Sequence, residues 1–251
     1  MEHADYVERI REHSEALRAA AVAVGPGATV PTCPEWTVHR LVRHIARVHG
    51  WVLENLSAAD PENPRPAPRP PEEWAELLDW WDDYRGRMLD FLAGADPAAP
   101  AWVFSPVAPA TVGFWSRRQA HEAAMHRLDV EHACAAAEHG GNDVPELAFP
   151  AEFAADGIDE VLLHVVPSHV TAWAQSTLRG TVLFHAVDIG RAWLVRLEPE
   201  QLPQTSRHVD VVDADATVAG NADAVYRAAW GRPHHAIVSG DAELLAAARG
   251  R

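Results

Sequence analysis

A carboxylate and an imidazole occur one helical turn apart in this chain. Glu122 and His126 are four residues apart, so a helix presents both side chains on one face. The same stripe passes through Trp115 and Ala133, which turns the pair toward an apolar interior. An unpaired charge is costly to bury, so the pair needs a partner. A metal ion is one candidate, and a buried salt bridge of Glu122 with Arg118 or His126 is the other.

The pattern differs from the zinc-protease motif H-E-x-x-H, in which two histidines share one helix face. His121 and His126 are five residues apart. This spacing separates them by roughly 140° around a helix of about 3.6 residues per turn, so both cannot face one ion without distortion. Catalytic zinc usually takes three protein ligands and keeps one open position. A metal site at Glu122 and His126 therefore needs a third ligand from another helix.

Histidines on two earlier helices are candidates for this third ligand. His39, His44 and His49 are five residues apart, so one of them, or a distorted two, can share a site. His44 and His49 flank opposite edges of the apolar stripe, and periodicity does not choose between them. His13 lies within the stripe of the first helix, where a core histidine bonded to a neighbour is the alternative. The other histidines of the fourth helix are expected to face solvent: His121, His132 and His139.

Composition and charge narrow the functional class. The chain has 251 residues, 48% of them hydrophobic, enough for one large domain or two ordinary ones. Its net charge of -15 opposes binding to phosphate backbones, so neither nucleic acid nor an anionic membrane is an expected partner. No apolar run approaches the roughly 20 residues of a membrane span, and the N-terminus lacks a signal-peptide pattern. The two cysteines form no framework or CxxC pair, so we expect a cytoplasmic protein.

Four helices are expected in the first part of the chain. Apolar residues recur at helical spacing over residues 5–24 and again after Thr37, which is a good N-cap. A third helix is expected over residues 74–92, and the fourth carries the carboxylate–imidazole pair and ends at Gly140. Half of residues 60–71 are prolines, which predicts a stiff extended connection. Long connections among four helices suit a bundle with crossovers.

The remainder of the chain has the pattern of a small α+β domain. Strands are expected at residues 181–186 and 192–197 around a turn at residues 188–190. The domain boundary is expected between Gly140 and Pro150, which gives a four-helix bundle over residues 1–145 and an α+β domain over residues 146–251. The other expected elements are helices at residues 158–166, 222–230 and 243–248 and strands at residues 216–220 and 236–238.

Two N-terminal motifs resemble a known family. The run V-P-T-C-P-E-W-T-V at residues 30–38, followed by L-V-R-H at residues 41–44, is similar to the N-terminal motif of the mycothiol-dependent maleylpyruvate isomerase family. Residues 121–129 match its second motif, H-E-x-x-x-H-R-x-D. The resemblance implies a DinB-like four-helix bundle joined to an α+β domain related to sterol-carrier folds. Weaker similarity to the second domain lies at residues 183–190, 230–232 and 238–241.

The resemblance also implies a ligand set and a cofactor. The family's metal ligands fall on His44, Glu122 and His126, a set that suits zinc by ligand type. Mycothiol is the implied cofactor or co-substrate. Arg232, in the Trp-Gly-Arg motif, is implied as a candidate catalytic residue that holds a substrate carboxylate. Its alternative role is that of an arginine at a helix C-terminus before Pro233.

The implied chemistry is nucleophilic addition by a thiol. Zinc binds thiolate and lowers the pKa of a thiol, so a zinc-bound thiolate can add to an activated double bond of a small carboxylate-bearing substrate. Rotation and expulsion of the thiol then give cis-trans isomerisation, whereas loss of another group gives an S-conjugate. The chain is thus expected to be an isomerase or a thiol S-transferase. The alternatives are a metal-dependent hydrolase with zinc-bound water, and a non-catalytic protein that binds a small ligand.

Overall fold

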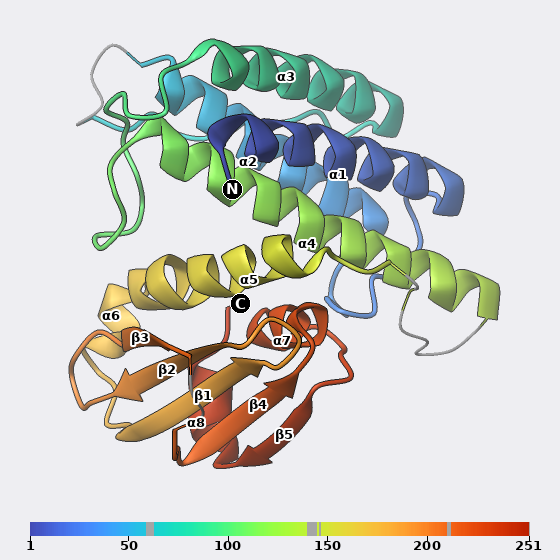
Figure 1. The fold of residues 1–251 in the computed structure, drawn as a ribbon. Coiled ribbons are helices and arrows are strands. Elements are labelled where there is room, and N and C mark those ends of the chain that lie inside the picture. The colour runs from blue at the N-terminus through green and yellow to red at the C-terminus, as the bar shows by residue number, and fades with distance from the viewer. Residues whose placement is uncertain (59–62, 140–144, 146, 210–211, 251) are drawn as a thin grey trace. The chain divides into compact units, whose positions relative to one another are not determined.

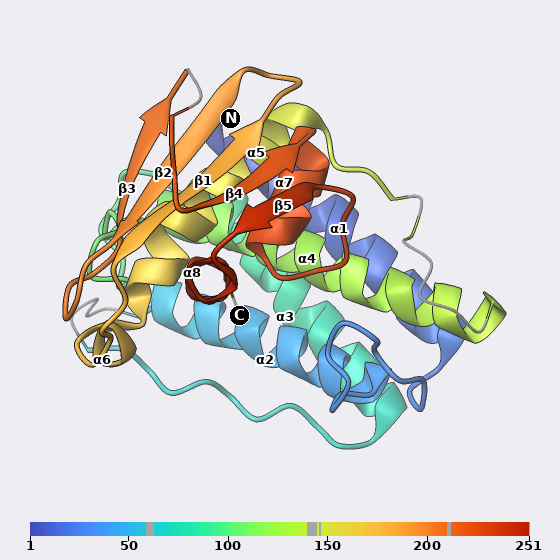
Figure 2. The same ribbon diagram turned by 90° about the horizontal axis from the view of Figure 1, so that it is seen from below.

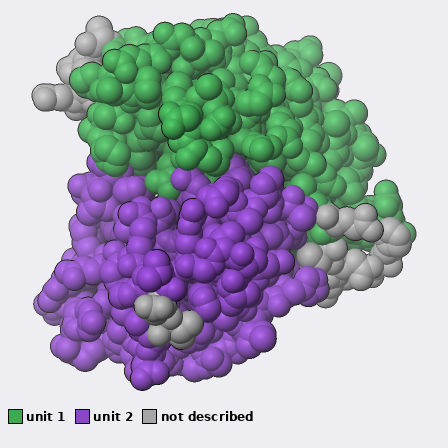
Figure 3. All heavy atoms as spheres, viewed as in Figure 1, with its two compact units in different colours: residues 1–103, 109–147 green, residues 104–108, 148–251 purple. Residues whose placement is uncertain are grey.

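The computed structural model describes residues 1–58, 63–139, 145, 147–209 and 212–250. The chain divides into two compact units (Figure 3). Unit 1 comprises residues 1–103 and 109–147, and unit 2 comprises residues 104–108 and 148–251. None of the helices within the described residues has both the length and the apolar character that a membrane crossing needs. The domain limits inferred from the sequence stay a prediction.

Unit 1 is a bundle of long helices, and all four expected helices are confirmed (Figure 1). Helix α1 packs along α4, and α2 packs against both α3 and α4. The predicted end of the fourth helix at Gly140 lies outside the described residues. The helices are α1 (His3–Val24), α2 (Val38–Leu56), α3 (Trp74–Gly94) and α4 (Val112–His139).

Helix α2 shows how an N-cap and a regular apolar spacing in the sequence determine where a helix of the bundle starts and which face it buries. Thr37 is its N-cap, as predicted, and the Thr37 side chain accepts a hydrogen bond from the backbone N–H of Arg40. Apolar residues at a spacing of three and four then form one buried face, which meets the core between α1, α3 and α4. The fully buried members of this face include Leu41, Val42, Ile45 and Val52.

The described part of the proline-rich connection between α2 and α3 forms neither helix nor strand. Residues 64–72, here called the strap, run alongside α2 (Figure 2). Asn55 holds its start, since the Asn55 side chain accepts from Arg65 N at 2.8 Å and donates to Arg65 O at 3.1 Å. At its far end, His39 Nε2 donates to Glu72 O at 2.8 Å. The predicted stiff connection is therefore fixed on α2 at both ends.

Unit 2 is a mixed five-stranded sheet with helices, which confirms the α+β class. The strand order is β3-β2-β1-β4-β5; β1 and β4 are parallel and the other neighbours are antiparallel. Helix α7 packs on β1 and β4, and α5 packs on α7 (Figure 1). The strands are β1 (Gly180–Ala186), β2 (Arg191–Leu197), β3 (Gln204–His208), β4 (Ala216–Gly220) and β5 (Ile237–Gly240). The helices are α5 (Ala151–Glu160), η1 (Val161–Val165), η2 (Val166–Ser168), α6 (Val170–Trp173), α7 (Ala222–Ala229) and α8 (Ala242–Ala247).

Two parts of unit 2 differ from the sequence-based expectation. Strand β3 was not predicted, because Gln204–His208 is a polar edge strand without an apolar alternation. The helix expected at residues 158–166 starts earlier, at Ala151, and changes to a π-helical turn over Val161–Val165. The other expected strands and helices are present, with ends shifted by one or two residues.

Candidate functional site

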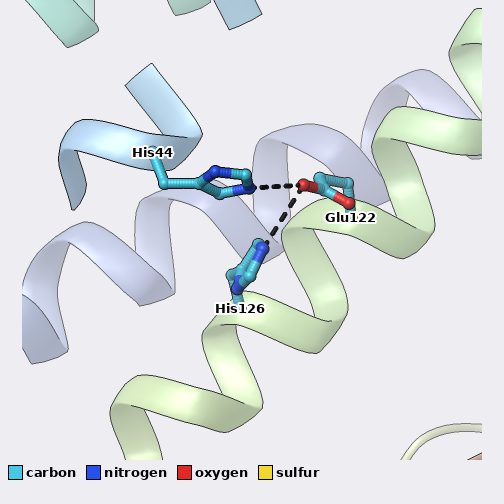
Figure 4. Close-up of side chains that lie close together, drawn as sticks. All are labelled: His44, Glu122 and His126. Carbon is cyan, nitrogen blue, oxygen red and sulfur yellow. Dashed lines mark hydrogen bonds and ion pairs between the residues drawn. The ribbon is translucent and has the colours of Figure 1, made fainter. Parts of the chain in front are cut away.

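Three side chains from two helices converge within unit 1. His44 projects from α2, and Glu122 and His126 project from α4 (Figure 4). Glu122 Oε1 lies 3.1 Å from His44 Nε2 and 3.3 Å from His126 Nε2. One donor atom from each residue lies within 4.8 Å of the others. The structure thus brings His44, rather than His49 or His13, to the carboxylate–imidazole pair; we call these three residues the His-Glu-His cluster.

The second oxygen of Glu122 is held by an arginine. Arg118, one turn earlier on α4, forms a nearly buried ion pair with Glu122 Oε2. Burial alone would raise the pKa of Glu122, but Arg118 and His126 outweigh it and hold this pKa well below its usual range. The salt bridge considered for Glu122 is therefore present, and a role as metal ligand stays a prediction. One oxygen pairs with Arg118, and the other faces two imidazole nitrogens.

His126 is oriented by a fully buried carboxylate that the sequence reasoning did not single out. Asp129 Oδ2 lies 2.9 Å from His126 Nδ1, and Asp129 Oδ1 accepts from Thr32 Oγ1 at 2.6 Å. Although burial lowers the pKa of His126, Glu122 and Asp129 raise it to about 9. A carboxylate at Nδ1 keeps that nitrogen protonated and leaves Nε2 to the cluster. The i, i+3 spacing of His126 and Asp129 was the available signal.

Trp36 forms an aromatic wall beside the cluster. Its ring stacks on His126 at a centroid distance of 6.3 Å and an interplanar angle of 21°. It also lies 5.2 Å from the ring of His44. The guanidinium of Arg40, in the first turn of α2, lies 5.3 Å from the centroid of the Trp36 ring. The turn that precedes α2 therefore limits the positions open to both imidazole rings.

The other candidate histidines have different environments. His49 is fully buried, and its Nδ1 accepts a hydrogen bond from Trp81 Nε1 at 3.0 Å. His13 is buried between α1 and α4, with Arg127 Nη1 at 3.3 Å from its Nδ1. The expectation that His121 and His132 face solvent was wrong, because both are buried. Polar side chains are thus buried where α1 and α4 pack together, which the apolar spacing along one helix does not predict. The His139 side chain lies outside the described residues.

Arg232 lies at the C-terminal end of α7 in unit 2. Gly231, at φ 66°, donates to Ala228 O, and the backbone N–H of Arg232 donates to Arg227 O at 2.9 Å. These two bonds form a Schellman motif, which explains the glycine of Trp-Gly-Arg. Arg232 Nη1 donates to Trp230 O at 2.8 Å. This local contact agrees with the helix-end role, and a role in substrate binding stays a prediction.

The donor set of the His-Glu-His cluster fits a metal ion. Two imidazole nitrogens and one carboxylate oxygen are ligand types that zinc accepts, and three protein ligands leave a coordination position open. The partners of the ligands also fit, since Asp129 holds His126 Nδ1 and Arg118 holds Glu122 Oε2. His44 is partly exposed, with 36% of its side chain accessible, so a small molecule can reach the cluster.

Comparisons with known proteins agree with this architecture. No curated protein sequence matches the chain significantly. A crystal structure of the mycothiol-dependent maleylpyruvate isomerase matches with 12% identity and a TM-score of 0.61, over 96% of this chain and 95% of that one. The structure of a point mutant of such an isomerase matches with 11% identity and a TM-score of 0.62 over the same shares. At this identity the likeness shows the fold.

Family models identify the chain more directly. The model described as "Mycothiol maleylpyruvate isomerase N-terminal domain" matches residues 4–131. The model described as "MDMPI C-terminal domain" matches residues 152–247. The resemblance found in the motifs is therefore confirmed, and the chain belongs to the mycothiol maleylpyruvate isomerase family.

Proposed function

We propose that the protein is a metal-dependent enzyme that uses mycothiol to isomerise or conjugate a small carboxylate-bearing molecule. The observation that carries the proposal is the approach of His44 Nε2 and His126 Nε2 to one oxygen of Glu122, at 3.1 and 3.3 Å. Membership of the mycothiol maleylpyruvate isomerase family supports the thiol. A cytoplasmic location is part of the proposal, since a reducing compartment keeps such a thiol reduced.

In this proposal His44, Glu122 and His126 hold the metal, with zinc as the expected ion. A metal held there would supply the Lewis acidity that lowers the pKa of a thiol. Asp129 keeps the proton of His126 on Nδ1, and Arg118 pairs with one oxygen of Glu122, so the other oxygen would be the one available to a metal. Trp36 packs on both imidazole rings and maintains their orientation. These residues position the donors before any ligand arrives.

The reaction follows from thiol addition to an activated double bond. A carbon–sulfur bond forms, the former double bond becomes single, and rotation about it becomes possible. Re-formation of the double bond with expulsion of the thiol completes a cis-trans isomerisation. If another group leaves instead, the product is an S-conjugate. We assign Arg232 to the substrate carboxylate, and Arg232→Ala should then lower kcat/KM about ten- to a hundredfold while metal content stays constant.

Proton release on thiol binding tests the proposal. Calorimetric titration of the metal-loaded protein with mycothiol, in two buffers of different ionisation enthalpy, gives the number of protons released. Below the usual thiol pKa of roughly 8.5, we expect close to one proton per thiol, because the bound form is the thiolate. Turnover without thiol, together with no proton release, would favour the alternative of metal-assisted hydrolysis. Retained ligand binding in a protein without metal would favour a non-catalytic binding protein.

A further inference from the structure

A pocket in unit 1 gathers positive charge in a chain whose net charge is -15. The pocket has a volume of about 780 Å³ and lies between α2 and the strap. The chain contains no lysine, so all 21 of its positively charged side chains are arginines. Glu72 is the one carboxylate among the described lining residues, whereas four arginines line the pocket: Arg40, Arg43, Arg47 and Arg69.

The arginines of the pocket lie on two walls, one formed by α2 and the other by the strap. On α2, Arg40, Arg43 and Arg47 follow spacings of three and four residues, so they share one face of the helix with His44. Opposite them, the strap carries Arg69 and is anchored at Arg65 and Glu72. Gly50 lets the strap approach closely, because a Cβ at this position would lie 2.7 Å from Pro68 Cγ. The pocket is therefore built by a fixed wall rather than by mobile side chains alone.

Two of the four arginines have an internal partner for the guanidinium. Arg43 Nη2 pairs with Glu72 at 2.5 Å, and Arg40 stacks on Trp36. Within the described part of the chain, no ion pair or hydrogen bond involves the guanidinium of Arg47 or Arg69. A solvated basic surface is the simple alternative for exposed arginines. Like charges gathered in a concave site with apolar walls repel one another, however, and an anion placed there relieves this repulsion.

We propose that this pocket is an anion subsite, with Arg47 and Arg69 as its principal donors. Guanidinium groups bind carboxylate and phosphoryl oxygens in a bidentate manner, so the ligand is a small molecule that carries one of these groups. His44 lines the same pocket and belongs to the His-Glu-His cluster. A ligand with its anionic end on the strap side thus extends its other end toward the cluster. This last link rests on the proposed function, but anion binding does not.

Titration with simple anions tests the subsite. We would titrate the full-length, metal-loaded protein with succinate and, separately, with phenyl phosphate at low ionic strength, in the absence of thiol. The stronger of the two probes identifies the group that the subsite prefers. Arg47→Gln and Arg69→Gln should each raise the Kd about three- to fivefold, and the double variant about tenfold. Arg11→Gln, which removes an exposed charge from α1, is the matched control and should leave the Kd unchanged.

Failure of both probes to bind, or an unchanged Kd in the double variant for the probe that binds, would overturn the inference. An equal loss of affinity in Arg11→Gln would overturn it as well, because the effect would then come from net charge alone. Binding to the metal ion itself would persist in the double variant, whose metal content should equal that of the wild-type protein. A failed proposed function would show instead as a missing thiol response in the wild-type protein, so the two failures are distinguishable.

Discussion

His44 and His49 lie on the same helix, five residues apart, in opposite chemical environments. The side chain of His44 is 36% exposed and its Nε2 faces Glu122. His49 is fully buried and accepts a hydrogen bond from Trp81. Burial lowers the pKa of His49 to about 3, so this imidazole is neutral at ordinary pH. The difference teaches that a carboxylate within reach, together with access for a ligand, separates a candidate ligand from a core histidine.

Removal of the carboxylate–imidazole pair should have the largest effect on this comparison. Glu122→Ala or His126→Ala should abolish stoichiometric metal binding, because each substitution removes one of the three donors of the His-Glu-His cluster. Circular dichroism should show a bundle that stays largely helical. His49→Asn is the matched control and should retain a full equivalent of metal by elemental analysis. Full metal content in both α4 variants would show that the cluster is not the metal site.

Asp129→Asn sharpens the comparison one step away from the ligands. The amide can no longer hold His126 Nδ1 as a carboxylate does, so His126 Nε2 becomes a weaker donor. We expect about a ten- to hundredfold loss of metal affinity, measured by competition with a chromogenic chelator. Asp83→Asn removes an exposed carboxylate on α3 and should leave the metal affinity unaltered. An Asp129→Asn affinity equal to that of the wild-type protein would limit Asp129 to a packing role.

The neutral state of His49 predicts a pH dependence of stability. Its folded pKa of about 3 lies below the ordinary histidine pKa of 6.5, so the unfolded chain binds more protons between these values. Stability is therefore complete above pH 6.5 and is lost as the pH falls toward 3. At a pH of about 5 the loss from His49 is about 2 kcal/mol. Denaturant unfolding of His49→Asn should show a flatter acid limb than the wild-type protein, and parallel limbs would contradict the assignment.

Substitution of Gly50 tests whether close packing against α2 holds the strap in place. A Cβ at Gly50 would lie 2.7 Å from Pro68 Cγ and 2.9 Å from Trp80 Cη2, so Gly50→Ala should cost about 1–3 kcal/mol. Gly86 on α3 is the matched control, because its Cβ would meet no described atom within 4 Å. Gly86→Ala should be neutral or stabilise by up to about 1 kcal/mol. Equal effects of the two substitutions on the free energy of unfolding would show that the strap moves freely.

Periodicity predicted the helices of unit 1 because each buries an apolar stripe of regular spacing. It did not predict β3, whose polar edge residues carry no alternation, or the burial of His121 and His132. Polar residues inside the α1–α4 pair follow from tertiary contacts, which spacing along one helix does not contain. The i, i+4 spacing did predict that Glu122 and His126 lie together, because both residues belong to one helix and their proximity needs no tertiary contact.

The third member of the cluster lay beyond local pattern. His44 and His49 were equivalent by helical angle, and the choice between them depends on how α2 packs against α4. The motif resemblance suggested His44, and the structure places its Nε2 beside Glu122. The position of the strap also depends on tertiary contacts. Its stiffness followed from its prolines, but its anchoring on Asn55 and His39 required the folded chain.

The central claim is that the His-Glu-His cluster binds a metal that activates a thiol. Cobalt in place of zinc gives the most direct measurement, because a thiolate bound to cobalt produces a sulfur-to-metal charge-transfer band. Addition of mycothiol to the cobalt protein should produce this band in the wild-type protein and in His49→Asn, and not in His44→Ala. Absence of the band from the wild-type protein, or an unchanged band in His44→Ala, would contradict the claim.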